Sequence, residues 1–260
     1  MSYQTIQLEK EGRYAQLTLN RPASMNAMDD VMMEELAEVF ERLEEDHDIQ
    51  VLLIHGAGKS FSAGGDIKKM VDPTVNFDMQ EAMTHVSNLG RALYRLPQIT
   101  IATVHGAAAG LGFSLALGCD FIIAEEESKM AMNFIGIGLV PDGGGHFFLK
   151  ERIGVANAKK MIWQREVMTA KKAQSFGLVD ELVPTGNGLT AAKAYAEQLL
   201  ASPIQAMIAT KKILHASKLK ELDEVLALET ELQPKMRETK DHREGIQAFV
   251  EKRKPKFIGE

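Results

Sequence analysis

Short apolar runs alternate with segments of helical period along the N-terminal part of the chain. Residues 29–43 repeat apolar side chains every three or four positions, for example at Met32, Leu36 and Phe40, which is typical of a helix with one buried face. Residues 49–54 are apolar at nearly every position, which is typical of a strand buried on both faces. By these criteria we predict helices at 29–43 and 81–96, strands at 13–19, 49–54, 99–104, 121–124, 129–133 and 178–183, and a surface loop at 71–79.

The C-terminal part of the chain has a different pattern. Helical periods dominate after about Gly145, and the Thr-Gly-Asn-Gly sequence at 185–188 is a clear break. Beyond it the chain is predicted to be helical, with Pro203 and Pro234 at helix starts or bends. The pattern therefore indicates an α/β core that carries the site, followed by a helical region. We place these two parts at residues 1–185 and 186–260.

Composition and charge narrow the class of protein. The chain has 260 residues, of which 45% are hydrophobic and 25% are charged, as in an ordinary globular protein. A net charge of −6 argues against nucleic acid as the main partner. No signal peptide or long uncharged apolar stretch occurs, so we expect a cytoplasmic protein that does not enter a membrane. The single cysteine, Cys119, excludes an internal disulfide, and no cluster of His, Cys and acidic residues has the spacing of a metal site.

Two glycine-rich segments, residues 55–67 and 105–118, each follow a predicted strand. Both begin with His-Gly-Ala. Their lack of side chains lets a ligand lie directly against peptide N–H groups, and the second segment leads into a predicted helix whose N-terminus adds partial positive charge. Each segment can therefore supply one N–H donor to a carbonyl oxygen that gains negative charge.

A series of short motifs occurs in order over nearly the whole chain, at residues 19–22, 26–27, 61–67, 103–120, 138–144 and 243–253. Their order and spacing resemble the enoyl-CoA hydratase/isomerase (crotonase) superfamily. The resemblance implies a spiral of ββα units followed by a C-terminal helical region that covers the site and builds a homotrimer or a dimer of trimers. It also implies an acyl-CoA thioester as the substrate, so that coenzyme A enters with the substrate and no cofactor is bound permanently.

The same resemblance assigns site residues. Gly65 and Leu111 align with the two backbone N–H donors of the family's oxyanion hole, which stabilise a thioester enolate. Basic residues of the C-terminal tail are implied to contact the coenzyme A moiety, often that of a neighbouring subunit. The residues predicted to bind the acyl-CoA are Ala63, Gly65, Asp66, Ile67, Leu111 and Lys252.

Two positions depart from the water-adding members of the family. Those enzymes carry two glutamates, and the matching positions here hold Ser114 and Phe134. Hydration needs a base to activate water and an acid to protonate carbon, so an ordinary hydratase is not expected. Asp142 is the carboxylate that remains, and residues 135–142 resemble the ring-modifying acyl-CoA isomerases of phenylacetate degradation. One carboxylate suffices for isomerisation, and apolar neighbours would raise its pKa toward neutrality.

We therefore predict an acyl-CoA isomerase that shifts a double bond or rearranges a ring, with Asp142 as acid/base and Gly65 and Leu111 as oxyanion donors. Asp142 can instead be a turn residue before glycines. The chain can also be an enoyl-CoA hydratase or another crotonase-type lyase, or a catalytically silent CoA-binding subunit. A serine hydrolase based on Ser114 fits poorly, because the last glycine of a Gly-x-Ser-x-Gly turn is missing. His146 would face the site if a helix begins near it.

Overall fold

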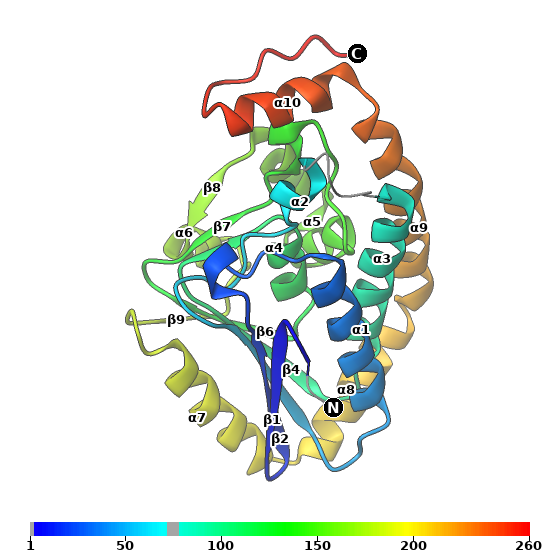
Figure 1. Cartoon of the computed structure of the whole chain (residues 1–260). Coiled ribbons are helices and arrows are strands. Elements are labelled where there is room, and N and C mark those ends of the chain that lie inside the picture. Colours follow the sequence, from blue (N-terminus) through cyan, green and yellow to red (C-terminus); the bar gives the residue numbers. More distant parts are fainter. Residues whose placement is uncertain (1–2, 72–77) are drawn as a thin grey trace.

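The computed structural model describes residues 3–71 and 78–260, and its architecture is α/β (Figure 1). Within these residues the larger sheet has six strands in the order β1-β2-β3-β4-β6-β9, in which β1 and β2 are antiparallel and the other neighbours are parallel. A smaller sheet has the order β5-β7-β8. The strands are β1 (Ile6–Glu11), β2 (Tyr14–Leu19), β3 (Val51–Gly56), β4 (Ile99–Val104), β5 (Ala107–Ala109), β6 (Phe121–Glu125), β7 (Lys129–Ala131), β8 (Val167–Thr169) and β9 (Glu181–Val183).

The helices predicted at 29–43 and 81–96 lie within two residues of those bounds, at Asp30–Glu44 and Met79–Arg95, whereas the short helix at Ile67–Val71 was not predicted. The carboxylate of Asp29 accepts a hydrogen bond from the amide of Met32 at 3.1 Å and so caps the helix that follows. The third helix ends before Pro97, since proline disfavours helical geometry in the residue before it. The helices are α1 (Asp30–Glu44), α2 (Ile67–Val71), α3 (Met79–Arg95), α4 (Leu111–Leu117), α5 (Gly145–Gln164), α6 (Ala170–Ser175), α7 (Gly188–Leu200), α8 (Ile204–Ala216), α9 (Leu219–Arg237) and α10 (Lys240–Val250), with short 3₁₀ turns η1 (Pro22–Ser24) and η2 (Phe134–Ile137).

The larger sheet is covered on both faces, which explains its continuous apolar strands. Along β3, Leu52 and Ile54 belong to the main core with α1, α3 and α4, whereas Val51 and Leu53 pack with α7 and α8. Figure 1 shows α7 on the opposite side of this sheet from α1 and α3. In a parallel strand that is buried on both faces, side chains of both sides are apolar, so the sequence shows a continuous apolar run instead of an alternation of apolar and polar residues. The boundary predicted between residues 185 and 186 falls in the turn before α7, and it stays a prediction.

Some elements have no clear apolar pattern and were not predicted. β1 is an edge strand of mostly exposed residues, and β8 is a short strand of three residues. β5 consists of three alanines inside the second glycine-rich segment and pairs with β7. Pro203 precedes α8 as expected, whereas Pro234 lies inside α9. The loop predicted at 71–79 lies largely outside the described residues.

Candidate active site

Main-chain hydrogen bonds hold the two glycine-rich segments side by side. The amide of Ser62 donates to the carbonyl oxygen of Ala107, and the amide of Ala109 donates to the carbonyl oxygen of Ser62, each at 3.0 Å. The Ser62 hydroxyl in turn donates to the carbonyl oxygen of Asn26 at 2.7 Å. Gly64 has φ of +93°, and a Cβ there would lie 2.6 Å from the Ala109 carbonyl oxygen, so glycine is required. This close approach brings the first segment against the start of α4.

Gly65 and Leu111 both line one cavity. Leu111 is the first residue of α4, so its N–H has no acceptor within the helix. Among residues 3–71 and 78–260, neither amide donates a hydrogen bond. Two unpaired N–H groups in one wall are suited to a single carbonyl oxygen of a ligand. Their use as an oxyanion hole stays a prediction that this geometry allows.

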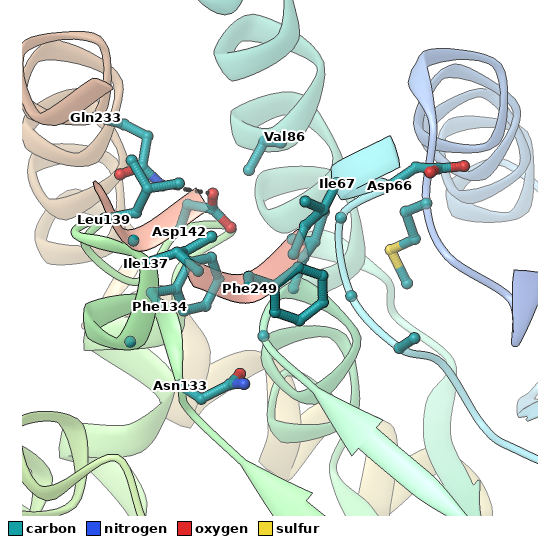
Figure 2. A pocket seen from close by; sticks show the side chains of 18 of the residues that line it. Asp66, Ile67, Val86, Asn133, Phe134, Ile137, Leu139, Asp142, Gln233 and Phe249 are labelled. Atoms are coloured by element: carbon teal, nitrogen blue, oxygen red, sulfur yellow. Dashed lines mark hydrogen bonds between the residues drawn. The ribbon is translucent and has the colours of Figure 1, made fainter. Parts of the chain in front are cut away.

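The cavity has a volume of about 580 Å³, and most of its wall is apolar. Figure 2 shows Phe134, Ile137 and Asp142 on one side and Asp66 and Ile67 on the other. A cavity of this size with few polar groups is typical of a small-molecule site. Its apolar side chains come mainly from α3 and from the η2 segment, namely Met79, Ala82, Met83, Val86, Phe134, Ile137 and Leu139.

Asp142 brings a carboxyl group to this apolar wall and is only 8% exposed. Its Oδ2 accepts a hydrogen bond from Nε2 of Gln233 at 2.9 Å, drawn as a dashed line in Figure 2. Its Oδ1 is buried and has no hydrogen-bond partner among the described residues. Burial and, to a lesser extent, the negative charge of Glu229 raise the pKa of Asp142 to about 8, although the hydrogen bond from Gln233 opposes the change. Such a carboxyl group can exchange a proton near neutral pH.

The loop that carries Asp142 is bonded to α9 at several points. The amide of Val140 donates to Oε1 of Gln233 at 3.0 Å, and Nε2 of Gln233 donates to the Val140 carbonyl oxygen at 2.9 Å. One turn earlier on α9, Glu229 accepts hydrogen bonds from the amides of Gly144 at 2.8 Å and of His146 at 3.2 Å. The loop is therefore fixed by two side chains of the C-terminal helical region.

Sequence reasoning did not identify Glu229 or Gln233. Both are almost fully buried, at 3% and 1% exposure. A signal was present, because they continue at helical spacing the buried face of α9 that begins with Leu222 and Leu226. Polar residues on the apolar face of a predicted helix need buried partners, and the Asp142 loop supplies them.

Known proteins provide the comparison that decides the family. The family model for enoyl-CoA hydratase/isomerase matches residues 9–260. The chain belongs to the enoyl-CoA hydratase/isomerase family. It is 46% identical over 252 residues to the "Putative enoyl-CoA hydratase/isomerase YhaR" of Bacillus subtilis (strain 168), with 97% of this chain and 98% of that protein covered. It is 36% identical over 246 residues to the 1,2-epoxyphenylacetyl-CoA isomerase of Escherichia coli (strain K12), with 94% of each covered.

A solved structure agrees with this assignment. The crystal structure of an enoyl-CoA hydratase from Mycobacterium avium subsp. paratuberculosis K-10 superimposes with a TM-score of 0.90 at 30% identity, covering 99% of this chain and 100% of that one. The family and the crotonase fold predicted from the sequence are thereby confirmed. Enoyl-CoA hydratases/isomerases act on acyl-CoA thioesters.

Two residues of this family member stand where the resemblance places the hydratase glutamates. Ser114 is fully buried and is not part of the cavity wall; its hydroxyl lies 3.5 Å from the Gly110 carbonyl oxygen. Phe134 lines the cavity with an aromatic ring (Figure 2). The sequence left open whether His146 faces the site; it lies outside the cavity wall, and its Nδ1 is 2.8 Å from Oε1 of Glu229.

The first group of predicted CoA-binding residues lines the cavity. Ala63, Asp66 and Ile67 all belong to its wall. Oδ2 of Asp66 lies 3.0 Å from Nη2 of Arg21, so this carboxylate is held in an ion pair at the cavity edge. Asp66 and Ile67 lie on the side of the cavity opposite Asp142 (Figure 2).

Lys252, in the C-terminal tail, is exposed and does not line the cavity of its own chain. Its neighbours Phe249, Arg253 and Pro255 do line it. Arg253 is itself bonded to Glu244, with 2.9 Å between Nη2 and Oε2. Contact between Lys252 and a coenzyme A moiety, in this subunit or a neighbouring one, stays a prediction.

In the part of the chain that the structure describes, no group of three or more His, Cys, Asp or Glu side chains is arranged to hold a metal ion. No helix within residues 3–71 and 78–260 is both long and apolar enough to cross a membrane.

Proposed function

We propose that this family member is an acyl-CoA isomerase that shifts a double bond, or rearranges a ring, through a thioester enolate. The thioester oxygen accepts hydrogen bonds from the amides of Gly65 and Leu111. Asp142, as a carboxylate, removes a proton from the carbon next to the carbonyl, and the electron pair of that C–H bond passes into the enolate. In a double-bond shift, Asp142 then returns the proton to the γ-carbon. The C=C bond has moved by one position, and no atom has been gained or lost.

The environment of Asp142 is the observation that carries this proposal. Its Oδ1 is buried beside the apolar wall without a described partner, and its pKa is raised to about 8. A group that takes a proton from one carbon and returns it to another must pass through both its neutral and its ionised form in every turnover. A pKa close to neutrality makes both forms accessible.

Hydration is supported less well by the other acids of the cavity. Besides Asp142, the wall contains Asp29, Asp30 and Asp66. Burial favours a higher pKa for Asp29, but its hydrogen bonds, first that from Lys69 at 2.7 Å, outweigh burial and lower the pKa below its ordinary value. Asp66 is likewise ion-paired. Asp29, with its lowered pKa, is a poor proton donor, whereas Asp142 has a pKa raised to about 8. The cavity therefore supports hydration less well than a reaction that needs one such carboxyl group.

The test is a panel of three CoA esters followed by mass spectrometry: trans-3-hexenoyl-CoA, trans-2-hexenoyl-CoA and 1,2-epoxyphenylacetyl-CoA. The last is included because a relative is named for its isomerisation. We expect the first or the last ester to be converted without a change in mass. Addition of one water to the 2-enoyl ester would instead identify a hydratase. Binding of the esters without conversion, and without exchange of their α-protons in deuterated water, would identify a silent CoA-binding subunit.

We also propose that the protein assembles as a trimer or a dimer of trimers. Large apolar side chains are exposed on the single chain, among them Trp163 at 64% and Ile213 at 72%. Exposed apolar surface of this kind is commonly covered by a partner. Sedimentation velocity at micromolar concentration measures the assembled mass, and a monomer there would contradict this proposal.

A further inference from the structure

The geometry of α9 assigns a role to two residues outside the predicted site. We propose that Gln233 and Glu229 are positioning residues for the reaction: together they fix the Asp142 carboxyl at the cavity wall and leave Oδ1 as the oxygen that exchanges the substrate proton. This inference rests on the proposed acid/base role of Asp142. It assigns to helix α9, through Gln233 and Glu229, the task of holding Asp142 in place for this role.

Hydrogen bonds with the backbone of Val140 fix the orientation of the Gln233 side chain that contacts Asp142. The Val140 amide donates to Oε1 of Gln233 at 3.0 Å, so the oxygen end of the side-chain amide is fixed there. The NH₂ end must then point the other way, where Nε2 donates to the Val140 carbonyl oxygen and to Oδ2 of Asp142, each at 2.9 Å. A reversed amide would set NH₂ against the Val140 N–H. Gln233 therefore occupies Oδ2, and Oδ1 is left without a hydrogen-bond partner among the described residues.

Glu229 holds the other end of the same loop. It is buried, and it accepts hydrogen bonds from the amides of Gly144 and His146 at the N-terminus of α5. Backbone N–H groups at a helix N-terminus favour an acceptor with negative charge, which here is the Glu229 carboxylate. That charge disfavours ionisation of Asp142, whereas the bond from Gln233 favours it. The two residues thus act on the same carboxyl in opposite directions.

Few titratable side chains lie next to Asp142. In the described part of the chain, α9 contributes Glu229 and α5 contributes His146, which lies behind Glu229 and bonds to it. The side chains that α3, α4 and η2 turn toward this space are apolar or neutral. Arg237, further along α9, contributes its positive charge to the lowered pKa of His242 of α10, which is due first to burial. A change at Glu229 or Gln233 should therefore be visible in the proton exchange of Asp142.

The test compares the pH profiles of three variants. The readout is kcat/KM for α-proton exchange of trans-3-hexenoyl-CoA in deuterated water. Glu229→Gln keeps the side-chain shape and removes the charge, so the acid limb of the profile should move to lower pH by about one unit. Gln233→Met keeps the length and removes the amide, so the acid limb should move to higher pH. Its kcat should fall roughly tenfold to a hundredfold while KM stays within about threefold. Glu231→Gln removes the same charge from the exposed face of α9 and should leave the profile unchanged.

The outcomes separate the two proposals. A purely structural role predicts lower unfolding temperatures with unmoved profiles, and that result in both α9 variants would overturn the positioning role. If Gln233→Met fails to fold by circular dichroism, Glu229→Gln decides the question alone. If Asp142→Asn retains wild-type exchange, the proposed function itself fails, whatever the α9 variants do. Opposite shifts of the acid limb in the two variants would support both.

Discussion

The cavity lies between two walls that are built in different ways. The loop wall consists of residues 62–67 and 107–112, and main-chain hydrogen bonds hold it together. The clamp wall presents Asp142 and Gln233 to the cavity, and the side chains of Glu229 and Gln233 hold the loop of residues 140–146 that carries Asp142. The partners in the clamp wall are more distant in the sequence, with 91 positions between Asp142 and Gln233. The loop wall carries N–H groups that can donate to a ligand's carbonyl oxygen, and the clamp wall carries a carboxyl group that can accept a proton.

This difference sets how each wall responds to mutation. A backbone N–H keeps its position and its polarity whatever side chain the residue carries, so the loop wall is damaged only when the N–H is deleted or the turn is blocked. A buried carboxyl depends on burial, on nearby charges and on hydrogen bonds for its proton affinity. The clamp wall should therefore be sensitive to conservative changes that the loop wall would tolerate.

Asp142→Asn gives the largest expected effect. The side chain keeps its size and loses the ability to take a proton, so we expect isomerisation to slow by roughly a hundredfold to ten-thousandfold. Binding of the acyl-CoA should change little, because the loop wall is intact. Single-turnover assays and isothermal titration measure the two quantities separately. Wild-type turnover in this variant, with its fold intact, would show that the proton acceptor lies elsewhere.

Gly65→Pro tests the loop wall by deleting one N–H donor. Removal of one oxyanion donor costs on the order of a hundredfold to a thousandfold in kcat. Gly65→Ala is the matched control, because it keeps the N–H and its Cβ would meet no atom within 4 Å in the described structure. We expect the alanine variant to lose far less activity than the proline variant. Equal losses in the two would mean that side-chain volume, rather than the N–H, matters at this position.

The loop wall could be predicted from the sequence because its signals are local. The glycine-rich segments 55–67 and 105–118, the strands before them and the capped start of α1 all come from short stretches whose pattern reflects their own structure. The resemblance to the family then paired Gly65 with Leu111, and the structure places both in one cavity wall. Main-chain geometry of this kind depends little on distant residues.

The clamp wall could be predicted only in part. Asp142 was found because it stands in a motif, but its partners Glu229 and Gln233 are polar residues on a helix predicted only as helix. Which loop α9 covers depends on how the helix crosses the rest of the molecule, and no local pattern encodes that. The same reason explains why the sequence left the role of His146 open, whereas in the structure its ring is bonded to Glu229 and lies outside the cavity wall.

The affinities of a thioester and of its thioether analogue test whether the loop wall binds the carbonyl oxygen of the ligand. Hexanoyl-CoA and S-hexyl-CoA share the coenzyme and the chain, and only the first has a carbonyl oxygen for the amides of Gly65 and Leu111. Two such hydrogen bonds should make the thioester bind about tenfold more tightly. Isothermal titration with wild-type protein and with Gly65→Pro gives the answer, since the advantage should shrink in the variant. Equal affinities in the wild type would leave the two N–H groups without a role in binding.

The stability of the protein against pH gives the smallest expected effect. Burial raises the pKa of Asp142 from 3.8 to about 8, so the folded protein keeps this group neutral over a range in which the unfolded chain ionises it. The stabilisation is fully present below about pH 4 and is lost as the pH rises through about 8. Asp142→Asn does not ionise, so its Tm should match that of the wild type near pH 4 and exceed it by a margin that grows as the pH rises toward 8.

Differential scanning calorimetry across this pH range measures the trend. Asp48→Asn is the control, because Asp48 is exposed and its replacement removes one charge without changing a buried group. The difference in Tm between this control and the wild type should not grow with pH. A constant difference for Asp142→Asn as well would mean that Asp142 ionises as easily in the folded protein as in the unfolded chain. The clamp wall would then hold the carboxyl in place without tuning its proton affinity.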